Sequence, residues 1–324
     1  MAITVTEKTA MVRCERFLFV LLLVLISILS WKESPAANAS DQSSPSPISV
    51  FVSIGAHLDF CRQIGGNRVS VRLALPPGKS PETYAPSPRQ INDLSRARLF
   101  FKVGLPFETA FLNKLKALPR SPDIIDTQAG IKLEPIPGAS YNRDHAKDRE
   151  RHHNSPHRHE GLDPHTWLDP ELALQQATTI YQSLSRIDPE GENIYSNNYK
   201  ILEYKLKVLD EELKNSFVPL HGGTIFVYHP AFSYFARAFG LQQRAIEIAG
   251  KTPKARDLAE FIKKARAEKI AALFVQPQFD RQSAKKIARA LNCAVIAIDP
   301  LAADYCANLR HIATTIQENI KVEK

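Results

Sequence analysis

The sequence predicts an α/β protein of two lobes, each with a mostly parallel sheet flanked by helices, and with one long helix between them. Three observations support this. Short apolar runs alternate with amphipathic stretches in both halves of the chain, which is typical of parallel sheets covered on both faces. An unusually long helical pattern separates the halves. The chain has 324 residues, of which 44% are hydrophobic, enough to bury two medium-sized cores.

The N-terminal lobe is expected to cover residues 48–188. Its apolar runs predict strands at 48–54, 69–75, 99–103 and 123–126, and its amphipathic stretches predict helices at 56–64, 88–96, 107–117 and 170–187. A stretch at 138–162 interrupts the pattern, because it lacks apolar periodicity and is dense in His, Arg, Asp and Glu. A loop of this length inside a compact domain is usually functional or disordered.

The long helical pattern runs over residues 189–218 and contains no Gly or Pro after Gly191. About 28 residues at 1.5 Å each span roughly 40 Å, which suits a helix that bridges two lobes. The C-terminal lobe then covers 219–324. Strands are expected at 224–228, 271–275 and 294–298, and helices at 231–239, 253–267, 281–291 and 304–320.

Residues 1–39 have the features of a secretory signal peptide. Basic residues precede an apolar run at 17–29, and Ala37 and Ala39 fit an A-x-A cleavage site. An uncleaved anchor is the alternative, but a membrane-spanning helix needs about 20 apolar residues. No cysteine lies directly after the apolar run, which argues against a lipid anchor. We expect a periplasmic protein cleaved near Ala39, with a disordered leader at 40–47.

Charge and cysteine content exclude other classes. The net charge is +8, but Lys and Arg are spread along the sequence among Asp and Glu, so we expect no nucleic-acid partner. Cleavage would leave Cys61, Cys293 and Cys306, none of them in a C-x-x-C pattern, so a cysteine zinc site is not expected. A disulfide between Cys293 and Cys306 is one option in an exported protein.

Histidine is concentrated between 145 and 165, where six of the ten histidines lie. Neutral imidazole is a good ligand for zinc, copper and nickel, so this tract is a candidate auxiliary metal-binding loop. The alternative is a solvated low-complexity insert. The five histidines of the irregular stretch are His145, His152, His153, His157 and His159.

Four other residues are candidates for a single ordered site. His165 lies between two prolines beside Trp167, and such a fixed imidazole is as well explained by a structural role as by metal ligation. His229 and Asp299 each follow a predicted strand directly, where side chains of α/β sheets point into the ligand crevice. Glu82 lies in a proline-rich loop after another strand and, taken alone, fits a turn carboxylate.

Together, Glu82, His165, His229 and Asp299 supply two nitrogen and two oxygen ligands, one pair from each lobe. Four-coordinate sites of this composition suit Zn²⁺, whereas Mn²⁺ and Fe²⁺ accept a larger share of oxygen.

The sequence resembles the periplasmic solute-binding proteins of zinc and manganese ABC importers over essentially the whole mature chain. The resemblance rests on four motifs: the proline-rich loop at 76–88, the segment D-P-H-T-W-L-D-P at 163–170, Y-H-P-A-F-S-Y-F at 228–235 with F-G-L at 239–241, and V-Q-P-Q-F at 275–279 with I-D-P-L at 298–301.

This resemblance implies a metal ion held between two lobes that are joined by a rigid helix, with a membrane permease as partner and a monomeric state. His165, His229 and Asp299 fall on ligand positions of the family, and the His-rich insert is similar to that of zinc-type members. Relatives usually have histidine where this chain has Glu82, which moves the metal preference toward manganese or iron. His57 is an alternative ligand.

We therefore expect a metal-capturing protein, not an enzyme, that hands zinc to a permease. An exported zinc hydrolase is the second hypothesis, because catalytic zinc keeps three protein ligands and one open position. No His-Glu-x-x-His helix supports it. A cell-surface adhesin is a third hypothesis, for which the sequence offers no anchor.

Overall fold

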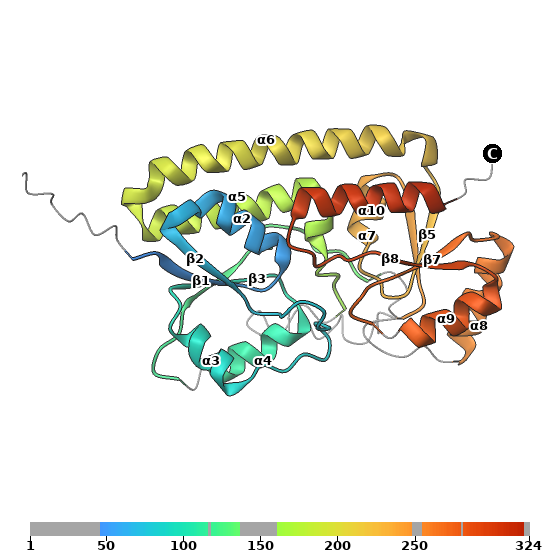
Figure 1. The fold of residues 1–324 in the computed structure, drawn as a ribbon, viewed down its shortest axis with the longest axis horizontal. Coiled ribbons are helices and arrows are strands. Elements are labelled where there is room, and N and C mark those ends of the chain that lie inside the picture. Colours follow the sequence, from blue (N-terminus) through green and yellow to red (C-terminus); the bar gives the residue numbers. More distant parts are fainter. Residues whose placement is uncertain (1–45, 116–117, 137–160, 248–254, 280, 321–324) are drawn as a thin grey trace, which may run out of the picture. The chain divides into compact units, whose positions relative to one another are not determined.

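A computed structural model describes residues 46–115, 118–136, 161–247, 255–279 and 281–320 (Figure 1). The expected signal peptide, nearly all of the leader at 40–47 and residues 138–160 of the His-rich loop lie outside these ranges. So do His145, His152, His153, His157 and His159. None of the helices in the described ranges combines the length and the apolar character that crossing a membrane requires.

The N-terminal lobe contains a four-stranded parallel sheet in the order β2-β1-β3-β4. Apolar runs form its two central strands, whose residues Val50–Val52 and Leu99–Phe101 are buried. Proline and an N-capping side chain begin two of the helices: Ser87 accepts from the amide of Gln90, and Asp169 from those of Glu171 and Leu172. The elements are β1 (Ile48–Val52), α2 (Gly55–Gly65), β2 (Val69–Leu73), α3 (Pro88–Ser95), β3 (Leu99–Lys102), α4 (Pro106–Leu115), β4 (Asp123–Asp126) and α5 (Pro170–Ile187).

The C-terminal lobe repeats this arrangement with the sheet order β6-β5-β7-β8, again fully parallel. Its elements are β5 (Thr224–Val227), α7 (Ser233–Ala238), β6 (Gln242–Ala245), α8 (Ala255–Ala267), β7 (Ala272–Val275), α9 (Arg281–Leu291), β8 (Ala294–Ala297) and α10 (Tyr305–Asn319). No strand is expected at β6 from the sequence. Its residues Q-Q-R-A include one apolar side chain, so no apolar run marks this strand.

The long helix α6 (Glu192–Phe217) has 26 residues, with a 3₁₀ turn at Pro189–Gly191 before it and another at Val218–Leu220 after it. Its buried face includes Tyr195, Leu206 and Phe217 and packs on α2, α5 and α10. Figure 1 shows α6 running alongside elements of both lobes. The expected fold class, two parallel α/β lobes joined by one long helix, is confirmed.

One hydrophobic core extends through both lobes and includes residues of both sheets and of α6. A smaller core lies in the C-terminal lobe between its sheet and the helices α8 and α9, around Phe226, Phe261 and Leu273. Cys306 packs against the first core and Cys293 against the second, and both are free thiols, as is Cys61. The Cys293–Cys306 disulfide considered from the sequence is therefore not formed.

Direct contacts also connect the lobes. The indole N–H of Trp167 donates to the carbonyl of Pro300 at 2.8 Å, and the Tyr305 hydroxyl donates to the carbonyl of Trp167 at 2.8 Å. Gly55, at the start of α2, leaves room for the 301–302 backbone: a Cβ at this position would lie 2.3 Å from the carbonyl oxygen of Leu301. The segment after β8 is thus packed against the N-terminal lobe.

Candidate metal site

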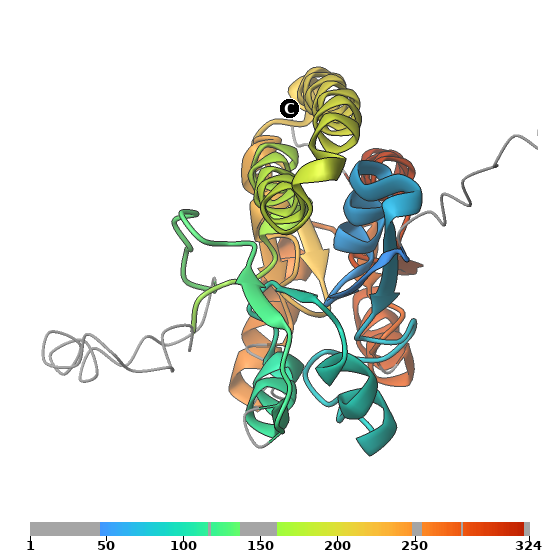
Figure 2. The same ribbon diagram turned by 90° about the vertical axis from the view of Figure 1, so that its left-hand side faces the viewer.

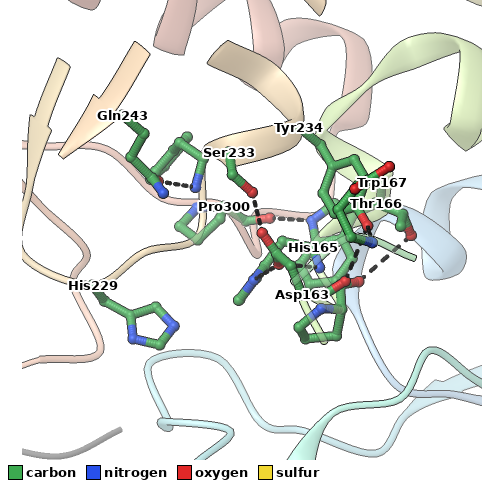
Figure 3. A network of polar contacts seen from close by, with 12 residues as sticks. Asp163, His165, Thr166, Trp167, His229, Ser233, Tyr234, Gln243 and Pro300 are labelled. Carbon is green, nitrogen blue, oxygen red and sulfur yellow. Dashed lines mark hydrogen bonds and ion pairs between the residues drawn. The ribbon is translucent and has the colours of Figure 1, made fainter. Parts of the chain in front are cut away.

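His165 is positioned by the carboxylate of Asp163, two residues before it. The imidazole Nδ1–H donates to Asp163 Oδ1 at 2.7 Å, and the backbone N–H of His165 donates to the same oxygen at 2.9 Å (Figure 3). The Trp167 ring lies against the imidazole, with ring centroids 5.2 Å apart. The His165 side chain is 7% exposed and Asp163 is completely buried, so the ring has little freedom to turn.

His229 follows β5 and is held in the same manner by residues of the C-terminal lobe. Its Nδ1–H donates to Glu247 Oε2 at 2.8 Å, and its ring stacks on Phe279 with centroids 4.6 Å apart. The side chain of Gln276 fixes the backbone from both sides. It accepts from the His229 N–H at 3.2 Å and donates to the His229 carbonyl at 2.8 Å.

Both imidazoles present the same nitrogen. A carboxylate accepts hydrogen bonds and donates none, so Asp163 and Glu247 each place the ring proton on Nδ1. The lone pair then lies on Nε2 in both His165 and His229. The two ring centroids are 5.4 Å apart. Histidine ligands of metal ions are typically oriented by such a carboxylate, which also raises their basicity.

Glu82 comes from the proline-rich loop between β2 and α3, and its carboxylate lies beside the His229 imidazole. Its Oε1 lies 3.5 Å from His229 Nε2, and its Oε2 accepts from the Ser80 hydroxyl at 3.0 Å. The Glu82 side chain is 15% exposed. The loop therefore brings an N-terminal carboxylate to the imidazole of the C-terminal lobe.

Asp299 follows β8 but has different neighbours. Its Oδ1 accepts from the backbone N–H of Leu301 at 2.9 Å and from the Gln278 amide at 2.8 Å. Among the described residues, no hydrogen bond or ion pair joins it to Glu82, His165 or His229. Nor does that part of the chain hold any ready-made group of three or more His, Cys, Asp or Glu side chains for a metal ion. Three of the four predicted ligands lie close together, and Asp299 does not complete the set.

His57 is a core residue and not an alternative ligand. It lies in the first turn of α2, fully buried, with Nε2 2.9 Å from Gln176 Oε1 and 3.4 Å from Thr127 Oγ1. Burial, which disfavours the charged form, lowers its pKa to about 4. The sequence pattern at the end of β1 did not reveal that the ring turns into the lobe.

A hydrogen bond between the lobes involves Asp163, the residue that positions His165. Asp163 Oδ2 accepts from the Ser233 hydroxyl of α7, so one carboxylate holds both the imidazole and the opposite lobe (Figure 3). Tyr234 lies next to this contact: its hydroxyl donates to the Asp163 carbonyl at 3.3 Å and accepts from the Glu134 N–H at 2.9 Å.

The positions of Ser233, Glu247 and Gln276 were not predicted as functional. Ser233 and Gln276 lie within the motifs quoted above, which is a signal that was available. Glu247 follows β6, the edge strand that the sequence did not indicate.

Paired imidazoles and a carboxylate between two α/β lobes define a metal-binding protein of the two-lobed solute-binding class. The family model described as zinc-uptake complex component A, periplasmic, matches residues 50–319, and the chain belongs to this family. It is a family of transport components, not of enzymes, and its function is to capture a divalent transition metal for delivery to an ABC permease. The hydrolase alternative is not favoured.

Individual similar proteins are also components of metal transporters. The chain is 27% identical over 292 residues to the manganese ABC transporter substrate-binding lipoprotein PsaA of Streptococcus mitis, covering 86% of this chain and 87% of the relative. A crystal structure of ZnuA superposes with a TM-score of 0.74 at 33% identity and covers 84% and 99% of the two chains. A zinc-bound ZnuA lacking residues 138–173 of its own numbering has a TM-score of 0.75 at 33% identity, covering 86% and 100%.

Proposed function

We propose that this protein binds one Zn²⁺ ion between its lobes through Glu82, His165, His229 and Asp299, outside the cytoplasmic membrane and as a monomer. The observation that carries the ligand assignment is the 3.5 Å separation between His229 Nε2 and Glu82 Oε1. Two ligand atoms about 2.1 Å from a tetrahedral zinc ion are about 3.4 Å apart, so this pair already has the spacing of one edge of the tetrahedron.

The orientation of the histidines supports the same proposal. Each Nδ1–H is held by a buried carboxylate, so His165 and His229 can bind a metal through Nε2 without first changing tautomer. A buried imidazole pair in contact with a carboxylate also loses little side-chain entropy when the ion arrives, because all three side chains are already mostly buried.

Asp299 is the proposed fourth ligand. Within the described residues both hydrogen bonds to its carboxylate go to Oδ1, so Oδ2 remains for the metal. Binding then requires the loop after β8 to move toward the histidines.

The preference for zinc rests on the balance of nitrogen and oxygen ligands. Two imidazoles and two carboxylates suit zinc, while manganese accepts the same set at a higher coordination number. The zinc-bound ZnuA relative favours zinc, and the manganese-transporter relative keeps Mn²⁺ as the second candidate.

Titration of the apo-protein tests the proposal. Calorimetry with Zn²⁺ at neutral pH should give one tight site, and competition with Mn²⁺ should leave zinc bound. His165→Ala, His229→Ala and Asp299→Ala should each weaken that site, whereas His311→Ala on the exposed face of α10 should not. Binding no tighter than millimolar would refute metal capture, and an Asp299→Ala variant with unchanged affinity would remove Asp299 from the ligand set.

The five histidines between 145 and 159 are proposed as weaker auxiliary sites. Zinc titration of the full chain should then show additional ions bound loosely. Deleting residues 145–159 should remove these ions and leave the tight site unchanged. If the deletion has no effect on stoichiometry, the segment does not bind zinc.

A further inference from the structure

Charge in this protein is divided between two sides, although no basic block appears in the sequence. Residues 170–217, which contain α5 and α6, have five Lys and Arg against eight Asp and Glu, a net charge of −3. Residues 88–126, which contain α3 and α4, have seven Lys and Arg against four Asp and Glu, a net charge of +3. Two of these positive charges are paired, Arg98 with Asp123 and Lys102 with Asp126. Residues 255–291, which contain α8 and α9, have nine against four, a net charge of +5.

The fold gathers the two positive segments on one side. Figures 1 and 2 both show α3, α4, α8 and α9 on the side away from α6. We call this the basic side. Opposite charge on opposite sides of a molecule orients it in an external electric field, so the protein as a whole has a preferred face toward anionic surfaces.

Among the described residues of 255–291, few of the positive side chains form an ion pair. Lys264 forms an ion pair with Glu260 at 2.9 Å, and Arg266 donates to the carbonyl of Ala290. The other exposed basic side chains make no ion pair among the described residues. These are Arg256, Lys263, Lys269, Lys285, Lys286 and Arg289.

A shallow hollow on α9 offers a place for one anionic group. Lys285, Arg289 and Asn292 line it together with Cys293 and Val295, and its volume is about 300 Å³. Two cationic side chains one helical turn apart, with an amide beside them, provide the donors that a phosphate group accepts.

We propose that the basic side binds the anionic phospholipid surface of the membrane that holds the permease. This rests on the proposed extracytoplasmic function only in locating the protein beside that membrane. A lipid surface fits better than a protein partner, because protein interfaces have an apolar and aromatic core. The exposed large apolar side chains of the described residues include none on α8 or α9.

Binding of this kind has a purpose in transport. The membrane concentrates the protein in two dimensions, and the charge asymmetry turns α6 away from the lipid. The lobes then search for the permease in one orientation, which raises the encounter rate without requiring tight lipid binding.

Vesicle flotation tests the proposal with the full mature chain. Vesicles of phosphatidylcholine and phosphatidylglycerol in equal parts should bind the protein at 50 mM salt, pure phosphatidylcholine vesicles should not, and 500 mM salt should release it. A triple variant with Lys285→Gln, Lys286→Gln and Arg289→Gln should bind roughly a hundredfold more weakly at low salt.

The matched control removes three charges from the opposite side, with Lys200→Gln, Lys205→Gln and Lys207→Gln on α6. Both triple variants lose three positive charges. A difference in vesicle binding between them therefore shows which side of the protein contacts the lipid. Thermal unfolding and zinc titration of both variants check that the fold and the metal site are intact. Failure of metal capture would therefore appear in the titration and not in the flotation.

Three results would overturn the proposal. The first is absence of binding to the phosphatidylglycerol vesicles. The second is an equal loss in the two triple variants, which would indicate net charge alone. The third is unchanged vesicle binding of the α9 variant together with reduced metal uptake in cells, which would assign the basic side to an acidic protein surface instead.

Discussion

Replacing Asp163 with asparagine should weaken zinc binding although Asp163 is not a proposed ligand. Its Oδ1 accepts two hydrogen bonds from His165, one from Nδ1–H and one from the backbone N–H. Hydrogen bonds to a charged group contribute about 1 kcal/mol more than neutral ones. Both bonds also exist without the metal, so only the part that strengthens when the ion withdraws charge from the ring affects the Kd. Loss of such a carboxylate partner should raise the Kd for zinc roughly thirtyfold, which corresponds to about 2 kcal/mol.

Asp169→Asn in the same motif is the matched control. Asp169 caps α5, where it accepts from the amides of Glu171 and Leu172, and asparagine caps a helix as well as aspartate does. Both variants should be measured by competition with a chelator of known affinity. A Kd for Asp163→Asn within threefold of the control would show that the carboxylate does not support His165 in the bound state, and the orientation argument would be wrong.

Three further predictions concern other parts of the molecule. Glu82→His should tighten zinc binding and weaken manganese binding in competitive titration, and unchanged affinities would mean that Glu82 does not touch the metal. The His57 pKa of about 4 lies below its unfolded value of 6.5, so the native state loses stability as pH falls through this range, by about 3 kcal/mol at pH 4. Urea unfolding at pH 7 and pH 4 should show that His57→Gln lacks this component, and equal losses in both proteins would contradict it. Gly55→Ala should cost about 2 kcal/mol in the same assay and also weaken zinc binding, because the new Cβ forces the Leu301 backbone away. A variant as stable as the parent would show that the two segments separate easily.

Much of the fold could be predicted because its signals are local. Buried parallel strands are apolar throughout, so β1, β3 and β5 were visible as short runs, and proline or a capping side chain marks where α3 and α5 begin. The strand β6 escaped detection because it contains one apolar residue, whereas the other edge strands, β2, β4 and β8, have apolar runs. The four residues of β6 pair with β5, and the residue types Q-Q-R-A do not indicate this pairing.

The candidate site was predictable only as a set of residue types at the ends of strands. His165 and His229 were found because prolines and strand ends mark them, and the structure brings their rings to 5.4 Å. Which carboxylate holds which imidazole depends on contacts between distant segments. Glu247 is 18 residues from His229 in sequence, and Ser233 is 70 residues from Asp163. Burial of His57 likewise depends on Gln176 of another helix.

The hydrophobic core that extends through both lobes determines how the protein unfolds. Since α6 contributes buried side chains to that core beside residues of both sheets, neither lobe can lose its structure without exposing apolar surface of the other. Heating should therefore give a single calorimetric transition in which the van't Hoff and measured enthalpies agree. The slowest-exchanging backbone amides should be spread over β1, β5 and α6 together, as one cooperative unit. The helices α8 and α9, which rest on the smaller core, are the place where partial opening would begin.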